Sequence, residues 1–462
     1  MENNKVMVVA VVEKLAKMQS IYCKFGIIIV ILQRNLYCIV RNDRDIPLNS
    51  VSYTMLEPFF RIHDYLVEHS EMPIRRLLMD EIDWNDRLIA IKGGRGVGKT
   101  DFLLARAKEI ESKEKPLYPD LAAKKHKSSV RHSCLYVNLN NFYFTEHSIV
   151  EFAGMFVKAG GHTLLLDQMF KYPNWSKELK KCYDKYKDLH IVFSASPVMR
   201  LIEDNKDIAG IVKMYNLRGF SFREYLNLQT GLTFRPYTLE DILHSHASIA
   251  REICEHVHPL EYFNDYLEHG YYPSYLELKN FEEDLLKTMN MMLEVDVLMI
   301  KQIDVACLPK LRRLLYIMLK ETPCTLNVSN ISEEIDLSRA TTMNYIKYLK
   351  DARLLNLLYM EGKQFPMKPS KVYMQNTNIA YMIATRELSQ QDVYETCFYC
   401  SLHGGHKVNA TERNAMFIVD GKYYFDVKTD VPTRESIRPC AVGNIETGRG
   451  NFIPLWLLGF LY

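Results

Sequence analysis

The segment that most constrains the fold is a glycine-rich loop that fits the pattern G-x-x-x-x-G-K-[ST]. An apolar run at 87–92 predicts a buried strand before the loop, and the pattern at 101–108 predicts a helix after it. In this order, successive backbone N–H groups surround a phosphate at the positive end of the helix. We therefore expect ATP to bind here, and the predicted binding residues are Gly93, Gly94, Arg95, Gly96, Val97, Gly98, Lys99, Thr100 and Asp101.

Two residues of this loop have specific predicted roles. The ammonium group of Lys99 would reach the β- and γ-phosphates, and the hydroxyl group of Thr100 would ligate Mg²⁺. Mg²⁺ is thus the predicted second cofactor.

A second motif is the apolar run at 163–166, which ends in Asp167 and Gln168. A strand that ends in an acid, downstream of a phosphate-binding loop, predicts that Asp167 holds the Mg²⁺ shell together with Thr100. The position after the acid normally carries a Glu that polarises the attacking water. Gln168 can hydrogen-bond water but cannot take its proton. We therefore expect weakened hydrolysis.

The next apolar strand, at 190–196, carries serines near its end. Beside the strand of Asp167, either Ser194 or Ser196 would face the γ-phosphate as a sensor. The catalytic set predicted from the sequence is Gln168, Asp167 and Ser194, although serines that merely end a strand are an equally open alternative. Strands separated by helices predict an α/β fold, with a parallel sheet that is covered on both faces.

Composition limits the class of protein. The chain has 462 residues, which is enough for two or three domains. Its formal charge of +2 argues against a protein that coats nucleic acid through its overall charge. Ten scattered cysteines are typical of reduced thiols, so we expect a cytoplasmic protein. The apolar run at 25–32 is too short to cross a bilayer, and no membrane role is predicted.

Several runs outside these motifs resemble one family, the prokaryotic AAA-type ATP-binding proteins. They lie at 172–179, which includes Trp175, at 219–226, at 270–273 and at 453–462. Members of that family carry a C-terminal domain of unknown function that is distantly akin to PD-(D/E)XK nucleases. The resemblance covers about Leu56 to Tyr462 and implies a P-loop NTPase core, a helical lid and a C-terminal α+β domain.

The expected domains combine this resemblance with the residue patterns. They are an N-terminal extension (1–55), an ATP-binding domain (56–230), a helical lid (231–305), a winged-helix module (306–362) and a nuclease-like α+β domain (363–462).

The chain departs from the family where hydrolysis is concerned. The family usually has Asp-Glu in place of Asp167-Gln168, and a pair of arginines where this chain has Gly210-Ile211. An arginine that stabilises the transferring phosphoryl group contributes about 10³–10⁵ in rate in other P-loop enzymes. Basic residues that could substitute for the missing pair are Lys213, Arg218 and Arg223.

The region 308–358 has the length and helical pattern of a winged helix. We expect Asn330 to cap its second helix and Ser338 to cap the third, with Met343, Ile346 and Leu349 on the core face of the third. Predicted outward residues that suit a DNA major groove are Arg339, Thr341, Thr342, Asn344 and Lys347. The alternative is that the module packs within the protein or against a partner protein.

The last region contains a predicted hairpin that turns at Asp420-Gly421. Asp426 and Lys428 share one strand face, as in a metal-dependent nuclease, and Glu395 is a possible third member of the site. The family's preceding acid aligns with Met416, whose thioether cannot ligate a hard cation. A surface hairpin is therefore the stronger interpretation. Zinc ligands at Cys397, Cys400, His403 and His406 are disfavoured because their spacing differs from that of structural zinc sites.

Three functions remain open on the sequence. The leading hypothesis is an ATP-binding switch with weakened hydrolysis. The alternatives are an ATP-gated nuclease that acts on DNA through the C-terminal domain, and a scaffold that is stabilised by nucleotide without catalysis. The protein partner is not predicted.

Overall fold

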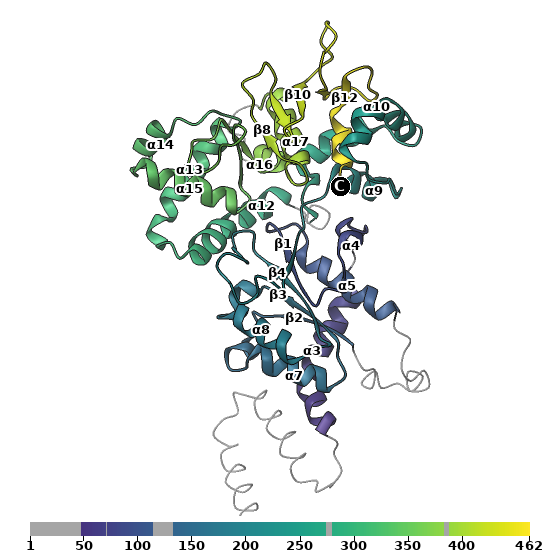
Figure 1. Ribbon diagram of the computed structural model, residues 1–462, viewed down its shortest axis with the longest axis vertical. Helices are drawn as coiled ribbons and strands as arrows, with labels where there is room; N and C mark the ends of the chain where they lie inside the picture. Colours follow the sequence, from purple (N-terminus) through teal and green to yellow (C-terminus); the bar gives the residue numbers. More distant parts are fainter. Residues whose placement is uncertain (1–47, 71, 114–132, 274–279, 383–387) are drawn as a thin grey trace, which may run out of the picture. The chain divides into compact units, whose positions relative to one another are not determined.

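The structure is a computed structural model and describes residues 48–70, 72–113, 133–273, 280–382 and 388–462 (Figure 1). The apolar pieces expected at 6–12 and 27–32, and nearly all of the polar excursion at 113–132, lie outside these ranges. The chain divides into two units, residues 1–55 and residues 56–462. Within the described ranges, each helix is too short or too polar to span a lipid bilayer.

A five-stranded parallel sheet carries the two motifs that were predicted to bind nucleotide, in the order β2-β3-β4-β1-β5. This confirms the α/β prediction. The register pairs Asn138 with Asp167 and Lys92 with Ala195, so the carboxyl ends of the central strands meet at one edge. The strands are β1 (Leu88–Lys92), β2 (Cys134–Asn138), β3 (Thr163–Asp167), β4 (His190–Ala195) and β5 (Lys213–Asn216).

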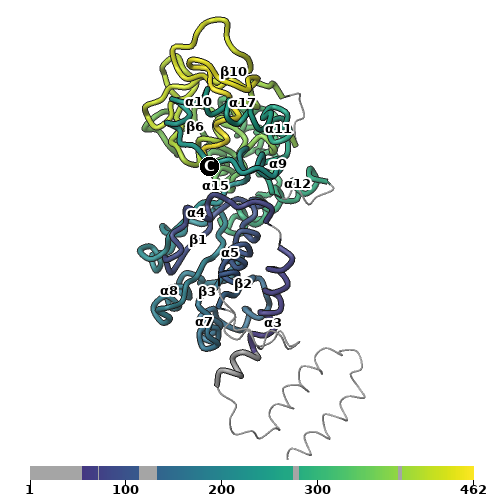
Figure 2. Tube along the Cα trace, turned by 90° about the vertical axis from the view of Figure 1, so that its right-hand side faces the viewer, coloured from purple at the N-terminus to yellow at the C-terminus, as the bar shows by residue number. Residues whose placement is uncertain are grey.

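Helices cover this sheet on both faces, because its central strands are apolar throughout. Helix α5 (Lys99–Lys113) buries Phe102, Leu103 and Leu104 against β2, β3 and β4. Helices α8 and α5 lie on opposite sides of the sheet in both views (Figures 1 and 2). The remaining elements of this part are α3 (Leu48–His69), α4 (Leu78–Glu81), α7 (Ile149–Lys158), α8 (Trp175–Lys185) and the 3-10 turns Phe142–Thr145 and Met169–Lys171.

The residues expected to form one helical lid pack into two different cores. The first group shares a core with the C-terminal strands and with α17 (Gln390–His403), and comprises α10 (Leu239–Cys254), α11 (Pro259–Asp265) and the π-helix Tyr266–Gly270. Helix α9 (Phe222–Thr230), which precedes the expected lid, joins the same core. The second group shares a core with the phosphate loop and with α13 (Leu308–Glu321), and comprises α12 (Phe281–Met291) and the π-helix η6 (Met292–Met299).

Three helices and a two-stranded antiparallel hairpin follow. They are α13 (Leu308–Glu321), preceded by the 3-10 turn Val305–Cys307, then α14 (Val328–Glu334), α15 (Arg339–Asp351), β6 (Leu355–Leu358) and β7 (Lys371–Met374). Ser338 caps α15 as predicted. The predicted cap Asn330 is wrong, because Asn327 caps α14 by accepting the Asn330 backbone N–H. Thr342 is wrong as an outward residue: it is fully buried, four residues before Ile346 on the same helix face.

The C-terminal region is a mixed five-stranded sheet in the order β12-β11-β10-β9-β8. Its hairpin turns at Asp420-Gly421, as predicted, with positive φ at both residues. Trp456 is fully buried and its ring packs on Phe222 of α9 and on Phe460. The elements are α16 (Thr377–Met382), α17 (Gln390–His403), β8 (Val408–Asn409), β9 (Phe417–Val419), β10 (Tyr423–Lys428), β11 (Cys440–Val442), β12 (Phe452–Pro454) and the 3-10 helix η8 (Leu455–Phe460).

One buried ion pair joins these parts. The guanidinium group of Arg76 donates from Nε to Glu224 at 3.1 Å, from Nη1 to the Val97 carbonyl at 3.2 Å, and from Nη2 to the carbonyls of Arg218 and Gly219. Arg76 is 4 % exposed and Glu224 is 2 % exposed. The pair thus links the phosphate loop to the start of α9 inside the protein.

We predict that Arg76→Met lowers the free energy of unfolding by about 3–5 kcal/mol, because it leaves the buried Glu224 carboxylate without its cation. Denaturant unfolding measures this. The neighbouring Arg75 is a matched control, since its pair with Asp80 is half exposed on both sides and Arg75→Met should cost no more than about 1 kcal/mol. Equal losses for the two variants would contradict the role of the buried pair.

Candidate nucleotide-binding site

A cavity of about 670 Å³ opens at the carboxyl edge of the parallel sheet. This volume falls in the usual range of ligand pockets, about 300–1,000 Å³. The cavity brings together most of the predicted site residues, which come from the phosphate loop and from the ends of β3 and β4. They are Arg95, Gly96, Gly98, Lys99, Thr100, Asp101, Asp167, Gln168 and Ser194. Gly93, Gly94 and Val97 lie instead on a second cavity behind the loop.

The phosphate loop has the conformation that its glycines were expected to allow. Gly96 and Gly98 have φ angles of 78° and 86°, which strain any other residue. Lys99 donates from Nζ to the carbonyls of Gly93 at 2.8 Å and Gly94 at 2.6 Å. Burial lowers the pKa of the Lys99 ammonium group to about 8. An anionic ligand would supply the negative charge that this buried cation lacks among its own hydrogen-bond partners.

Asp167 is the centre of the hydrogen bonds at the end of β3. Its Oδ2 accepts from the hydroxyl group of Thr100 at 2.7 Å and from that of Tyr136 at 2.9 Å. Its Oδ1 accepts from Ser194 Oγ and, at 2.8 Å, from the backbone N–H of Gln168. The predicted pairing of Thr100 with Asp167 is therefore present. Their oxygens are the kind of ligand that Mg²⁺ prefers, so these two residues fit the ion.

Tyr136 is not among the site residues predicted from the sequence, where it lies inside the apolar strand β2. Burial, reinforced by the Asp167 charge, raises the pKa of its phenol well above the usual value. The hydroxyl group therefore stays protonated and serves as a fixed donor to Asp167.

The position of Gln168 is unusual because its backbone is left-handed, with φ of 57°. In this conformation its N–H donates to both Asp167 and Ser194 Oγ, the latter at 2.9 Å. Gln168 also lines the cavity. Ser194, the predicted sensor, has its hydroxyl group engaged with Asp167.

A buried carboxylate that the sequence analysis missed is Asp296, on the π-helix η6. It is 1 % exposed and accepts from Arg95 Nε and from Ser196 Oγ, both at 2.6 Å. It therefore connects η6 to the phosphate loop and to the end of β4. The signal in the sequence was an acid inside an apolar helical run at 292–299.

The basic residues considered as substitutes for the missing arginines do not line this cavity. Lys213 is exposed on β5. Arg218 stacks on the Tyr462 ring at 4.2 Å, and Arg223 donates to the carbonyls of Tyr462 and Phe234. The arginines that do line the cavity are Arg76 and Arg95, and both are paired with carboxylates.

The predicted nuclease residues have separate partners. Glu395 pairs with Lys371 at 2.5 Å and accepts from Tyr373 and Gln391. Asp426 accepts the Met416 backbone N–H at 3.2 Å and faces Arg438 at 3.6 Å, while Lys428 is exposed. Among the described interactions, none joins Glu395 to Asp426 or Lys428.

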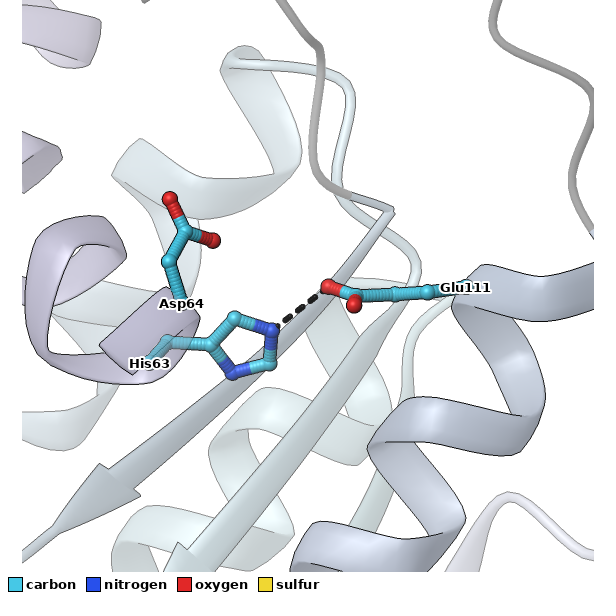
Figure 3. A group of neighbouring side chains, drawn as sticks. All are labelled: His63, Asp64 and Glu111. Carbon is cyan, nitrogen blue, oxygen red and sulfur yellow. Dashed lines mark hydrogen bonds and ion pairs between the residues drawn. The ribbon is translucent and has the colours of Figure 1, made fainter. Parts of the chain in front are cut away.

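His63, Asp64 and Glu111 form another group of side chains that lie close enough together to hold a metal ion (Figure 3). His63 Nδ1 accepts the Tyr136 backbone N–H at 2.9 Å, so the proton on Nε2 faces Glu111 at 2.7 Å. Both ring nitrogens are engaged, and we assign the group a structural role that fixes α3 and α5 against β2.

Comparison with known proteins identifies part of the chain. Residues 85–226 match the family model of an AAA domain, and residues 260–389 match a domain of unknown function. Together with the parallel sheet and the loop after β1, the first match shows an AAA-type P-loop ATPase core. One curated relative, the uncharacterised protein MJ1637 of Methanocaldococcus jannaschii, is 24% identical over 204 residues, which is 43% of each chain. The match thus spans less than half of the relative's length.

Solved structures that resemble the chain do so only weakly. The Aeropyrum pernix ORC1 protein in complex with DNA has a TM-score of 0.28 at 12% identity, covering 74% of this chain and 93% of that one. RuvB of Thermotoga maritima has a TM-score of 0.27 at 11% identity, covering 72% and 95%. AMPPCP-bound DnaA from Aquifex aeolicus has 0.24 at 14% identity, covering 64% and 88%. At these scores the likeness carries no argument about function.

We predict that the pair of Arg95 and Asp296 has a coupling energy of about 1–3 kcal/mol in a double-mutant cycle, because Asp296 is almost fully buried. The substitutions are Arg95→Gln and Asp296→Asn, and denaturant unfolding is the measurement. The control cycle uses Glu294, on the same π-helix, with Arg312: both are about half exposed, so their coupling should stay below about 1 kcal/mol. A coupling for Arg95 and Asp296 no larger than this control would refute the connection.

Proposed function

We propose that the protein is an ATP-binding AAA-type switch in which hydrolysis is weakened. The observation that carries the proposal is the pairing of Thr100 with Asp167 beside the buried Lys99. Lys99 and the loop N–H groups would hold the phosphates, and Thr100 with Asp167 would hold Mg²⁺. When bound, Mg²⁺ neutralises phosphate charge.

Weakened hydrolysis is supported by what the other side chains of the cavity are doing. Gln168 can orient water through its amide, but it cannot remove a proton. The carboxylates of Asp167 and Asp296 are both engaged by donors from the protein. The guanidinium group of Arg76 is hydrogen-bonded to Glu224 and to three backbone carbonyls. Lys99 is therefore the cation that is best placed to bind the phosphates.

The switch would operate through Arg95 and Asp296. A phosphate beside Lys99 would compete with Asp296 for the Arg95 guanidinium, because both are anions that favour the same donor. Asp296 lies on η6, and η6 packs against α13 and α15. The nucleotide state would in this way reach the three-helix module, which we propose as the part that contacts DNA or a protein partner.

We predict that Gln168→Glu raises the turnover of ATP by about 10²-fold, because it restores a carboxylate that can accept the proton of the attacking water. The affinity for ATP should change little. Turnover is measured by phosphate release with saturating ATP and Mg²⁺. Gln and Glu have nearly the same size, and they cost a similar free energy in the left-handed backbone conformation of residue 168.

The control for this experiment is Gln168→Ala, which should show no gain, while Lys99→Ala should lose ATP binding. Brisk hydrolysis by the natural sequence, with no gain from Gln168→Glu, would show that the weakened-ATPase proposal is wrong. Repeating the assay with duplex DNA tests the proposed DNA contact, since a change in turnover requires that DNA binds.

We predict that the affinity for ATP falls as the pH rises above about 8, by up to tenfold per unit. Burial lowers the pKa of Lys99 in the free protein, whereas bound phosphate favours the ammonium form, so binding above this pH requires uptake of a proton. Calorimetric titrations between about pH 7 and 10 measure the effect. Lys99→Arg keeps its charge and should flatten the profile; identical profiles for the two proteins would contradict the assignment.

A further inference from the structure

A second cavity, of about 260 Å³, lies behind the phosphate loop. Arg95 lines both this cavity and the nucleotide site, but the other residues that line the second cavity do not line the first. Its walls come from the loop at 93–97, the end of β5, the turn after α15 and the end of α17. Parts of the sequence that are far apart thus close around one small space.

The charges around this space are all of one sign. Its lining includes Arg95, Arg218, Lys350 and Arg353, together with His403, and none of the lining residues is an Asp or a Glu. The nearest carboxylate partner of Lys350 is Asp351, at 3.9 Å and outside the lining. Arg95 is paired with Asp296 at 2.6 Å, whereas the described ion pairs include none for Arg218 or Arg353. Clustered cations repel one another most where water is partly excluded, so Arg218, Lys350 and Arg353 cost free energy here without an anion.

The electrostatic cost is visible in the neighbouring groups. Burial, followed by the charges of Arg353 and Lys350, lowers the pKa of His403 to about 4. Burial also lowers the pKa of Lys350; the Asp351 charge opposes this effect, and the Arg353 charge adds to it more weakly. Among the described residues, the buried atoms Arg95 Nη2 and His403 Nδ1 have no hydrogen-bond partner.

Local geometry holds these cations in place. Gly404 makes room for Arg218, since a Cβ there would lie 1.9 Å from the Arg218 guanidinium carbon. Arg353 has a left-handed backbone with φ of 64°, a conformation that costs free energy in a residue other than glycine. The fold therefore keeps Arg353 at a strained position beside the phosphate loop.

We propose that this cavity is a second anion site that binds a small phosphate, either free phosphate or a small phosphomonoester. Planar guanidinium groups match phosphate oxygens in pairs, and Arg is the residue that most often recognises them in this way. The volume lies just below that of pockets for drug-sized ligands, which favours a small anion. The site is distinct from the proposed ATP site because Lys99, Thr100 and Asp167 do not line it.

The test uses Lys99→Ala protein, in which the nucleotide site is disabled, so that remaining phosphate binding reports the second cavity. Inorganic phosphate, pyrophosphate and glycerol phosphate are titrated by calorimetry at constant ionic strength, with potassium chloride as the blank. We expect saturable binding, which Arg353→Gln weakens by at least about tenfold, as loss of a charged hydrogen bond does. The tightest of the three probes distinguishes free phosphate from a phosphomonoester.

The matched control is Arg251→Gln, which removes the same charge from an exposed position near the end of α10. It should bind phosphate as the parent does. Melting temperatures without phosphate separate a binding role from a structural one: Arg353→Gln should be as stable as the parent or more stable, because it relieves repulsion between cations. No binding in Lys99→Ala protein, equal affinities for Arg353→Gln and Arg251→Gln, or a less stable Arg353→Gln that binds normally would each overturn the proposal.

Discussion

The buried guanidinium of Arg76 is the contact on which the arrangement of the parts depends. Its donors reach a carboxylate of α9 and carbonyls on both the phosphate loop and the segment after β5. Glu224 in turn accepts the backbone N–H groups of Leu77 and Ser221. A charge pair taken out of water is tolerated only when nearly all of its hydrogen bonds are made, and here they are. The phosphate loop is thereby fixed to a helix that packs on the C-terminal core.

The nucleotide site depends on a second set of fixed polar contacts, around Asp167. Donors from β2, β4 and α5 converge on one carboxylate, so its orientation is set before any ligand arrives. Preorganised groups of this kind need not reorganise when a cation binds, which favours binding. The same contacts leave Asp167 unsuited to act as a base. In the proposed function, binding and chemistry are separated within one site: the side chains that would bind Mg²⁺ and ATP are present, whereas Gln168 would not accept a proton from water.

The features that could be predicted from the sequence are those that depend on residues close together along the chain. The glycine-rich loop, Asp167 at a strand end, the cap Ser338 and the turn at Asp420-Gly421 follow from local rules. Asp296 and the pair of Arg76 with Glu224 could not be predicted in this way, because their partners lie 100 or more residues away in the chain. The error at Thr342 was avoidable: residues 342, 346 and 349 share one face of a helix, and a polar side chain drew the interpretation away from that periodicity. The domain limits remain predictions, although the helices after α9 join two different cores.

Arg95 borders both cavities, and its Nε is held by Asp296 at the first. A single side chain that serves two ligand sites makes their affinities depend on each other. If a ligand at one cavity changes how Arg95 is paired, it changes the affinity at the other, and thermodynamics requires the same factor in the reverse direction. A small anion bound in the second cavity would then change the affinity for nucleotide in the first. The cellular concentration of that anion would therefore affect how much nucleotide the protein binds.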